Sequence, residues 1–281
     1  MTWRWSAAER HECGKVFRSF SRETGEETDD HPTLGMTRLL EAHSLVKSFG
    51  GLVAVNNLDL HLDRGEILGL IGPNGSGKTT LFNLIAGVLR PDSGQIWFEG
   101  KKISDAGCAD ICQSGIGRTF QIPRPFPRLT VLENVKLGRA YGSSPARTLT
   151  QAGADAQEVL EFVGLGAKRS MMAGSLGLMD RKRLELAKAL ATRPRLLLLD
   201  EIMAGLNPTE VQAAMDLVRT IRNAGISLIV VEHVMRAVLG LSERVVVLNA
   251  GRKIAEGPPR QVVRDRQVIE AYLGADDDAQ G

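Results

Sequence analysis

Residues 66–85 read EILGLIGPNGSGKTTLFNLI, and this stretch decides the fold. The apolar run at 66–71 predicts a buried strand, and LFNLIAGVL at 81–89 predicts a helix. Between them, GPNGSGKT at 72–79 fits the phosphate-loop pattern GxxxxGK[ST] without a mismatch. Glycines let such a loop wrap its backbone N–H groups around phosphate oxygens, and the following helix adds its positive N-terminus. The stretch therefore predicts a strand–loop–helix unit that binds a nucleotide.

The loop residues have separate expected roles. Lys78 is expected to reach the β- and γ-phosphates, and the Thr79 hydroxyl is expected to hold Mg²⁺. The predicted nucleotide-binding set comprises Gly72, Pro73, Asn74, Gly75, Ser76, Gly77, Lys78, Thr79 and Thr80.

A second apolar run, RLLLLD at 195–200, predicts another buried strand and ends in the acidic pair Asp200-Glu201. Acidic pairs at strand ends are common, but a strand-end acid beside a phosphate loop is where Mg²⁺ is held. Asp200 is expected to bind the metal through water, and Glu201 is expected to polarise the attacking water as a general base. His233 follows the strand-like run LIVVE, where its ring can point at the γ-phosphate.

The rest of the pattern predicts an α/β fold with an inserted or appended helical part. Further strands are expected near 39–45 and 58–62, with turns at Glu99-Gly100 and Ala250-Gly251. Residues 129–193 are largely helical in pattern, because apolar residues recur three and four apart.

The ends of the chain differ from its middle. Residues 1–36 show no hydrophobic period and no apolar signal core, which predicts a disordered extension. A translation start at Met36 is the alternative. Residues 37–274 form the predicted nucleotide-binding domain, with a helical subdomain at about 125–193, and 275–281 form a polar acidic tail. Within the domain, another helix is expected around 208–223.

Composition excludes several classes of protein. The 281 residues are 43% hydrophobic and 24% charged with a net charge of +2, as in ordinary globular proteins. No run of five or more like charges indicates a nucleic-acid partner. No segment approaches the roughly 20 apolar residues that span a bilayer. Cys108 and Cys112 lack further nearby ligands for zinc, and we expect them to be small core residues.

Three longer stretches resemble the ATP-binding cassette (ABC) ATPases, and within them the branched-chain amino-acid importer subfamily. They are GIGRTFQIPRPFPRLTVLENV at 115–135, LLLLDEIMAGLNPTE at 196–210 and VIEAYLG at 268–274. The resemblance covers about 37–274. It implies a P-loop ATPase with a RecA-like parallel-sheet core, an antiparallel β subdomain and an inserted α-helical subdomain.

The resemblance also implies roles for single residues. Phe49 matches the aromatic that stacks on adenine, and Gln121 matches the glutamine that touches Mg²⁺ and moves with the γ-phosphate. The loop at 204–207 matches the one that crosses the dimer interface, although the family usually ends it in Asp. The implied catalytic residues are Glu201, His233, Lys78 and Gln121. The implied metal-binding residues are Thr79, Gln121 and Asp200. The implied interface loop comprises Ala204, Gly205, Leu206 and Asn207.

The family's signature, Leu-Ser-Gly-Gly-Gln, falls on Leu176, Gly177, Leu178, Met179 and Asp180. The serine hydroxyl is absent, and side chains replace both glycines, which limits close approach to a phosphate. We expect Asp180 to cap a helix that begins at Arg181, with contact to the opposing γ-phosphate as the alternative. In this family the signature acts on nucleotide bound to the other subunit, so this one would serve the partner's phosphate loop.

By resemblance, the chain is the ATP-binding and ATP-hydrolysing subunit of an importer for branched-chain amino acids or related small amides. ATP and Mg²⁺ are the expected cofactors. The expected partners are a second ABC ATPase in a homo- or heterodimer, transmembrane permeases and, indirectly, an extracytoplasmic substrate-binding protein. The expected place is the cytoplasmic face of the plasma membrane, and no nucleic-acid partner is expected. The alternative is a regulatory ABC protein with little or no hydrolysis. A kinase or a non-transport ABC protein fits the motifs less well.

Overall fold

The structure, a computed structural model, describes residues 38–277. The extension predicted at 1–36 and the last four residues of the predicted tail lie outside the described residues. The described chain falls into two compact units. The smaller unit is formed by 123–193, and the larger unit by 38–122 together with 194–277.

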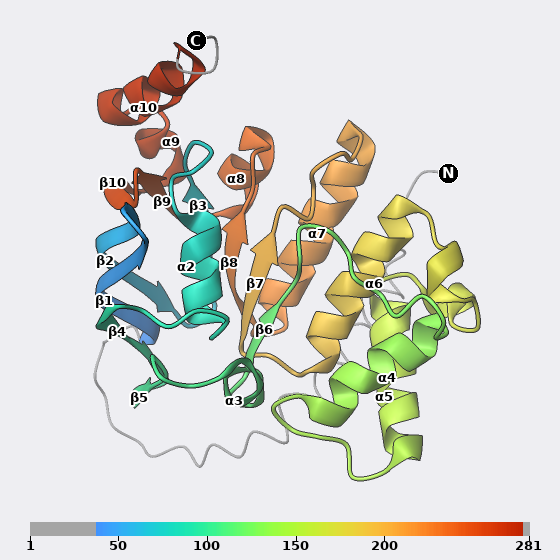
Figure 1. Ribbon diagram of the computed structural model, residues 1–281. Helices are drawn as coiled ribbons and strands as arrows, with labels where there is room; N and C mark the ends of the chain where they lie inside the picture. The colour runs from blue at the N-terminus through green and yellow to red at the C-terminus, as the bar shows by residue number, and fades with distance from the viewer. Residues whose placement is uncertain (1–37, 278–281) are drawn as a thin grey trace, which may run out of the picture. The chain divides into compact units, whose positions relative to one another are not determined.

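The larger unit contains two β-sheets (Figure 1). Within the described residues, one sheet has the order β2-β1-β4-β5 and the other the order β10-β9-β3-β8-β7-β6. The strands are β1 (Arg38–Phe49), β2 (Leu52–Asp63), β3 (Ile67–Ile71), β4 (Ser93–Phe98), β5 (Lys101–Lys102), β6 (Ile116–Arg118), β7 (Leu196–Asp200), β8 (Ser227–Val231), β9 (Arg244–Asn249) and β10 (Arg252–Gly257).

The centre of the second sheet is parallel. β3 pairs in parallel with β8 and β9, and β7 pairs in parallel with β8 and β6. Every residue of β3, β7 and β8 is buried. Strands covered on both faces must be apolar along their whole length, which is why ILGLI, LLLLD and SLIVV show no alternation.

Both predicted turns are confirmed. Glu99-Gly100 joins β4 to β5, and Ala250-Gly251 joins β9 to β10, with positive φ at all four residues. Two consecutive positive φ angles define the tight hairpin turn that matches the twist of the flanking strands. The strands predicted near 39–45 and 58–62 are also present, as parts of the longer β1 and β2.

The helices of the larger unit are α2 (Lys78–Ile85), α3 (Cys108–Gln113), α7 (Pro208–Asn223), α8 (Met235–Leu241), α9 (Pro259–Val262) and α10 (Arg266–Asp277). The bounds predicted for α7 are confirmed. The Asn207 side chain accepts hydrogen bonds from the N–H groups of Thr209 and Glu210, while the Glu210 carboxylate accepts one from the Asn207 N–H. This capping box and Pro208 at the first position fix where α7 begins.

The cysteine prediction is wrong for Cys108. Its side chain is exposed and lies 3.2 Å from the Gly87 carbonyl, while Cys112 is half-buried. The reason is that α3 buries a single residue, Ile111, and turns its other faces outward.

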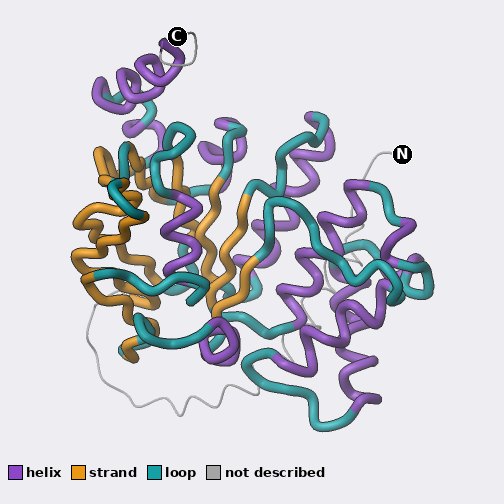
Figure 2. The backbone as a smooth tube through the Cα atoms, viewed as in Figure 1, coloured by secondary structure: helices purple, strands orange, loops and turns teal. Residues whose placement is uncertain are grey.

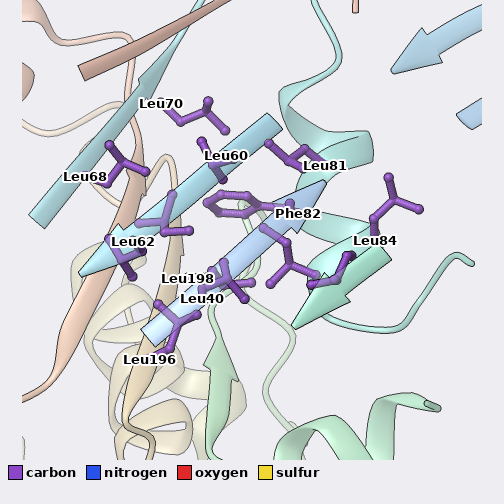
Figure 3. Close-up of a cluster of buried hydrophobic side chains, with 14 of the residues drawn as sticks. Leu40, Leu60, Leu62, Leu68, Leu70, Leu81, Phe82, Leu84, Leu196 and Leu198 are labelled. Carbon is purple, nitrogen blue, oxygen red and sulfur yellow. The ribbon is translucent and has the colours of Figure 1, made fainter. Parts of the chain in front are cut away.

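The core of the larger unit joins both sheets to α2 (Figure 3). Phe82 of α2 is fully buried there, among leucines that come from β1, β2, β3 and β7. The labelled members are Leu40, Leu60, Leu62, Leu68, Leu70, Leu81, Phe82, Leu84, Leu196 and Leu198. Close packing leaves a core side chain little freedom to move, so the start of α2 and the loop before it have a fixed position.

The smaller unit is built from helices and loops (Figure 2), as its sequence pattern predicts. Its helices are α4 (Val131–Tyr141), α5 (Leu149–Phe162) and α6 (Leu178–Ala191), with 3₁₀ turns at Gly166–Lys168 and Ala173–Ser175. α4 packs against both α5 and α6. A Thr130–Glu133 capping box begins α4.

One half-buried carboxylate links the elements of the smaller unit. The Asp155 Oδ2 atom of α5 lies 2.5 Å from Nε of Arg139 on α4 and 3.3 Å from Nη2 of Arg193. The Arg139 side chain is almost fully buried and also donates to the Ser144 carbonyl. A buried charge is tolerated when it is paired and hydrogen-bonded, so Asp155 compensates two guanidinium groups at once.

Asp155→Ala is expected to lower the free energy of unfolding by about 3 kcal/mol, because it leaves buried arginine charge without this carboxylate. Urea denaturation followed by circular dichroism measures the change. The matched control is Asp216→Ala, which breaks an ion pair with Arg219 whose side chains are 56% and 41% exposed. That control is expected to cost no more than about 1 kcal/mol. Equal losses in the two variants would contradict the prediction.

Candidate functional site

The predicted phosphate loop joins the end of β3 to the start of α2. Two of its glycines have no room for a side chain. A Cβ on Gly72 would lie 2.1 Å from the Leu248 carbonyl oxygen, and one on Gly77, where φ is +102°, would lie 2.4 Å from the Ala54 carbonyl oxygen. The loop therefore packs closely against neighbouring backbone segments. Of the other predicted binding residues, Ser76 is buried, Asn74, Gly75 and Thr79 are exposed, and Pro73 and Thr80 are half-buried.

The Lys78 side chain is buried and curls back over the loop. Its ammonium donates to the carbonyl oxygens of Gly72 at 2.8 Å and Pro73 at 3.0 Å, and to Ser76 Oγ at 3.4 Å. Burial lowers the pKa of the Lys78 amine below its ordinary value, while the carboxylates of Glu201 and Asp200 oppose that shift. The loop lies near the acidic pair, because Leu70 of β3 and Asp200 of β7 both pair with Val231 of β8.

Both oxygens of the Glu201 carboxylate are held. Gln121 Nε2 donates to Oε2 at 2.6 Å, and His233 Nε2 lies 2.8 Å from Oε1. The backbone of Glu201 has a φ of +49°, which is uncommon for a residue with a side chain, and its N–H donates to the Val231 carbonyl. Gln121 and His233, which the sequence separates widely, thus meet at the carboxylate of Glu201.

Asp200 is buried at the end of β7 and contacts an arginine for which the sequence patterns predicted no role. Arg118 Nη2 lies 3.2 Å from Asp200 Oδ2. Burial raises the pKa of the Asp200 carboxyl above its ordinary value, and the hydrogen bond and charge of Arg118 oppose that shift. No local sequence signal identifies this pair, because Arg118 and Asp200 become neighbours only through the parallel pairing of β6 with β7.

The C-terminal helix also reaches the loop, a contact that the sequence did not indicate. Burial raises the pKa of the Tyr272 hydroxyl of α10, and the nearby backbone N–H of Gly72 opposes that shift. The Tyr272 ring packs against a buried cluster that includes Ile71 and Val247.

Two further predicted segments lie in the larger unit. Phe49 ends β1 with 47% of its surface exposed, and Lys47 Nζ lies 5.8 Å from its ring centroid. The loop at 204–207 turns back on itself through hydrogen bonds from Ala204 to Glu201 and from Leu206 to Met203. Its last residue, Asn207, caps α7, a role that Asn fills as well as Asp does.

The signature segment lies in the smaller unit, and the prediction about Asp180 is wrong. α6 begins at Leu178, with Gly177 as its N-cap, so Asp180 lies inside the first turn. Its carboxylate pairs with Lys168, and Arg183 Nη1 lies 3.6 Å from its other oxygen. The extended ψ of 168° at Gly177 lets the helix start three residues earlier than expected. An acid in the first turn suits the helix dipole without capping it.

Other residues of the segment behave differently. Leu176 is buried, and Leu178 has 57% of its surface exposed. Arg181, the expected start of the helix, donates to the Gly174 carbonyl at 2.9 Å. Gly177 has a φ of −66°, and a Cβ there would meet nothing within 4 Å.

Comparisons with known proteins identify the family of this chain. A family model described as "ABC transporter" matches residues 55–204, and one described as "Branched-chain amino acid ATP-binding cassette transporter" matches 252–278. The high-affinity branched-chain amino acid transport ATP-binding protein LivG of Salmonella typhimurium is 39% identical over 84% of this chain and 98% of LivG. The lipopolysaccharide export ATP-binding protein LptB of Acidithiobacillus ferridurans is 35% identical over 85% of this chain and 98% of LptB.

A solved structure gives the same fold. The ADP conformation of MJ1267, an ATP-binding cassette of an ABC transporter, has a TM-score of 0.78 at 33% identity. The match covers 85% of this chain and 99% of MJ1267.

Gly77→Ala is expected to weaken nucleotide binding. A left-handed residue with a Cβ costs about 1–2 kcal/mol, and the loop must also move off the Ala54 carbonyl. The dissociation constant for a fluorescent ATP analogue should rise about tenfold or more, the equivalent of about 1.4 kcal/mol. Gly225→Ala is the control, since Gly225 has a φ of +93°, lies in a remote turn and has nothing within 4 Å of the point where a Cβ would stand. A similar loss of binding in both variants would contradict the assignment of this loop.

Proposed function

Because the chain belongs to the ABC transporter family and is an ABC ATPase, we propose that it powers an importer of branched-chain amino acids or related small amides. The match at 252–278 and the name of LivG support this cargo. LptB is nearly as similar and serves lipopolysaccharide export, so the cargo is set by the membrane and binding-protein partners. The ATPase supplies nucleotide-driven motion to whichever permease it joins.

The proposal of hydrolysis rests on one observation. Gln121 and His233 contact the Glu201 carboxylate at the end of the parallel sheet where the phosphate loop also lies. We assign Glu201 as the general base, which takes a proton from water as its oxygen attacks the γ-phosphorus. The bond from the γ-phosphorus to the bridging oxygen breaks, and ADP and phosphate form. Gln121 and His233 fix the direction of the Glu201 carboxylate, and the position of a base decides its efficiency.

Lys78 and Phe49 would bind the two ends of the nucleotide. In the structure, loop carbonyls and a hydroxyl solvate the Lys78 ammonium. Phosphate oxygens would replace them with stronger, charge-assisted bonds. The exposed Phe49 ring would stack on the adenine.

The residues present fit Mg²⁺. A hydroxyl at the start of α2 (Thr79), a buried carboxylate (Asp200) and an amide (Gln121) are the oxygen donors that this ion accepts, with phosphates and waters completing its shell. When bound, Mg²⁺ would neutralise charge on the β- and γ-phosphates. Asp200 would hold it through water.

ATP-binding subunits of ABC transporters work as dimers with transmembrane permeases. We propose that this chain pairs with a companion ABC ATPase, with a substrate-binding protein acting indirectly, on the cytoplasmic face of the plasma membrane. Among the described residues, none of the helices has the length and apolarity that crossing a bilayer requires. In this assembly, 37–274 would form the ABC domain, with the helical subdomain at about 125–193.

The signature of this chain would contact ATP on the partner's loop. Asp180 is paired with Lys168 and Arg183, so its negative charge is compensated inside the smaller unit and opposes a phosphate less. The N-terminus of α6 then remains as a positive contact for the phosphate. This pairing favours a working subunit over a regulatory protein that binds ATP without turnover.

Glu201→Gln is expected to slow ATP hydrolysis by about a hundredfold at the site that contains it, because the general base is lost. The measurement is phosphate release by the complex with the companion ATPase, alongside ATP binding, which should persist. Glu243→Gln is the isosteric control, since Glu243 pairs with Arg222 on the surface, and it should leave hydrolysis unchanged. An unaltered rate in Glu201→Gln would favour the regulatory protein instead.

Gly177→Ser is expected to raise hydrolysis at the partner's phosphate loop several-fold, because it restores the signature hydroxyl at a position with an open Cβ site. The serine would also cap α6, which contributes a few tenths of a kcal/mol. Phosphate release is measured in the Glu201→Gln background, where the partner's loop supplies the remaining activity. Gly153→Ser, in α5 and similarly open, controls for general stabilisation. No gain over that control would argue against a role in trans.

A further inference from the structure

Arg118 makes two directional contacts at the edge of the parallel sheet. It ends β6, and its Nη2 atom lies 3.2 Å from Asp200 Oδ2. Its Nη1 atom donates to Asn83 Oδ1 on α2 at 2.6 Å. Only 11% of the Arg118 side chain and 7% of the Asp200 side chain are exposed. A guanidinium has a rigid fork of donors, so one arginine can hold both partners at a fixed separation.

Two aromatic rings also fix the guanidinium. Arg118 Cζ lies 5.7 Å from the ring centroid of Phe82 and 5.5 Å from that of Phe120. Cations within about 6 Å of a ring centroid are attracted to its face. Since Phe82 is anchored in the core, the position of Arg118 is tied to the helix that follows the phosphate loop.

The segment that carries Arg118 touches both members of the acidic pair. Arg118 contacts Asp200, and Gln121, three residues further on, contacts Glu201. Thr119 between them accepts a hydrogen bond from the Asp200 N–H at 3.2 Å. The segment 118–121 thus holds the backbone and side chain of Asp200 and the side chain of its neighbour.

We propose that Arg118 is a positioning residue for the metal-binding carboxylate. It holds Asp200 Oδ2 and leaves Oδ1 to hold, through water, the Mg²⁺ that accompanies the nucleotide. This inference rests on the proposed role of Asp200 in metal binding. It adds that the arginine, which is fixed to α2 and β6, holds the metal-binding carboxylate in one orientation. The carboxylate then has little freedom to rotate before the metal binds. Partners that orient metal-ligating groups commonly change metal affinity by about 10–100-fold when removed.

The competing explanation is an ion pair that only stabilises the fold. That explanation predicts a lower stability for an Arg118 variant and the same metal affinity. The two explanations therefore separate on metal binding, measured apart from catalysis. Mn²⁺ is a suitable probe because it accepts the same oxygen ligands as Mg²⁺ and is visible by electron paramagnetic resonance.

The test is Arg118→Met in the full chain. The dissociation constant of Mn²⁺ in the presence of saturating ADP is expected to rise about tenfold, while the affinity for a fluorescent ADP analogue in EDTA stays the same. Arg118→Lys should recover part of the loss, because a lysine keeps the charge but not the fork. Asn83→Ala removes the second anchor and should shift Mn²⁺ binding in the same direction by less, which keeps the proposal testable if Arg118→Met does not fold.

Arg195→Met is the matched control. Its guanidinium lies 5.7 Å from the Phe98 ring centroid and 2.8 Å from Glu99, partners other than the acidic pair, and Mn²⁺ affinity should not change. Asp200→Asn separates the role of Arg118 from that of Asp200. If it weakens Mn²⁺ binding and Arg118→Met does not, or if Arg118→Met tightens it, the inference about Arg118 is overturned and the metal role of Asp200 stands. If Asp200→Asn has no effect, the metal role itself fails.

Discussion

The parallel pairing of β3, β8 and β7 is the constraint on which the rest of the structure depends. These strands are buried along their whole length, so polar groups can enter the sheet only where the strands end. In a parallel sheet those ends share one edge, which is where α/β proteins bind their ligands. The phosphate loop follows β3, the acidic pair closes β7 and His233 follows β8. The chemistry of the site is therefore gathered by the direction of the strands.

The charged groups at this edge already have partners within the protein. Loop carbonyls surround the ammonium of Lys78, Arg118 pairs with Asp200, and an amide and an imidazole hold Glu201. Burying a charge without a partner is costly, so each group needs this compensation before a nucleotide arrives. Binding of a magnesium nucleotide would then exchange the internal partners of Lys78 for phosphate oxygens, while Arg118 keeps its contact with Asp200. Such an exchange lets the Lys78 side chain adopt two arrangements, as a subunit that closes and reopens requires.

In the smaller unit, the charged residue of the signature segment also has partners within the protein. An aspartate replaces an uncharged residue of the family pattern, but Lys168 and Arg183 compensate it, and α6 starts early enough to enclose it in its first turn. The departure from the family pattern therefore changes the shape and side chains of this contact surface more than its charge. The missing hydroxyl at Gly177 is the larger difference, because a glycine N-cap supplies no side chain at the helix start.

The sequence by itself determined every feature that rests on local spacing. These features are the phosphate loop, the two hairpin turns, the bounds of α7 and the placement of Glu201 and His233 at strand ends, because each follows from neighbours within a few residues. Only the tertiary structure decided the partners of buried charges. Arg118 and Asp200 are 82 residues apart, and strand order alone makes them neighbours. Asp180 has the local preference of a helix cap, yet it lies in the first turn of α6 and pairs with Lys168, which precedes the helix, as well as with Arg183. Long-range pairing of charge depends on which elements pack together, and no short stretch of sequence contains that information.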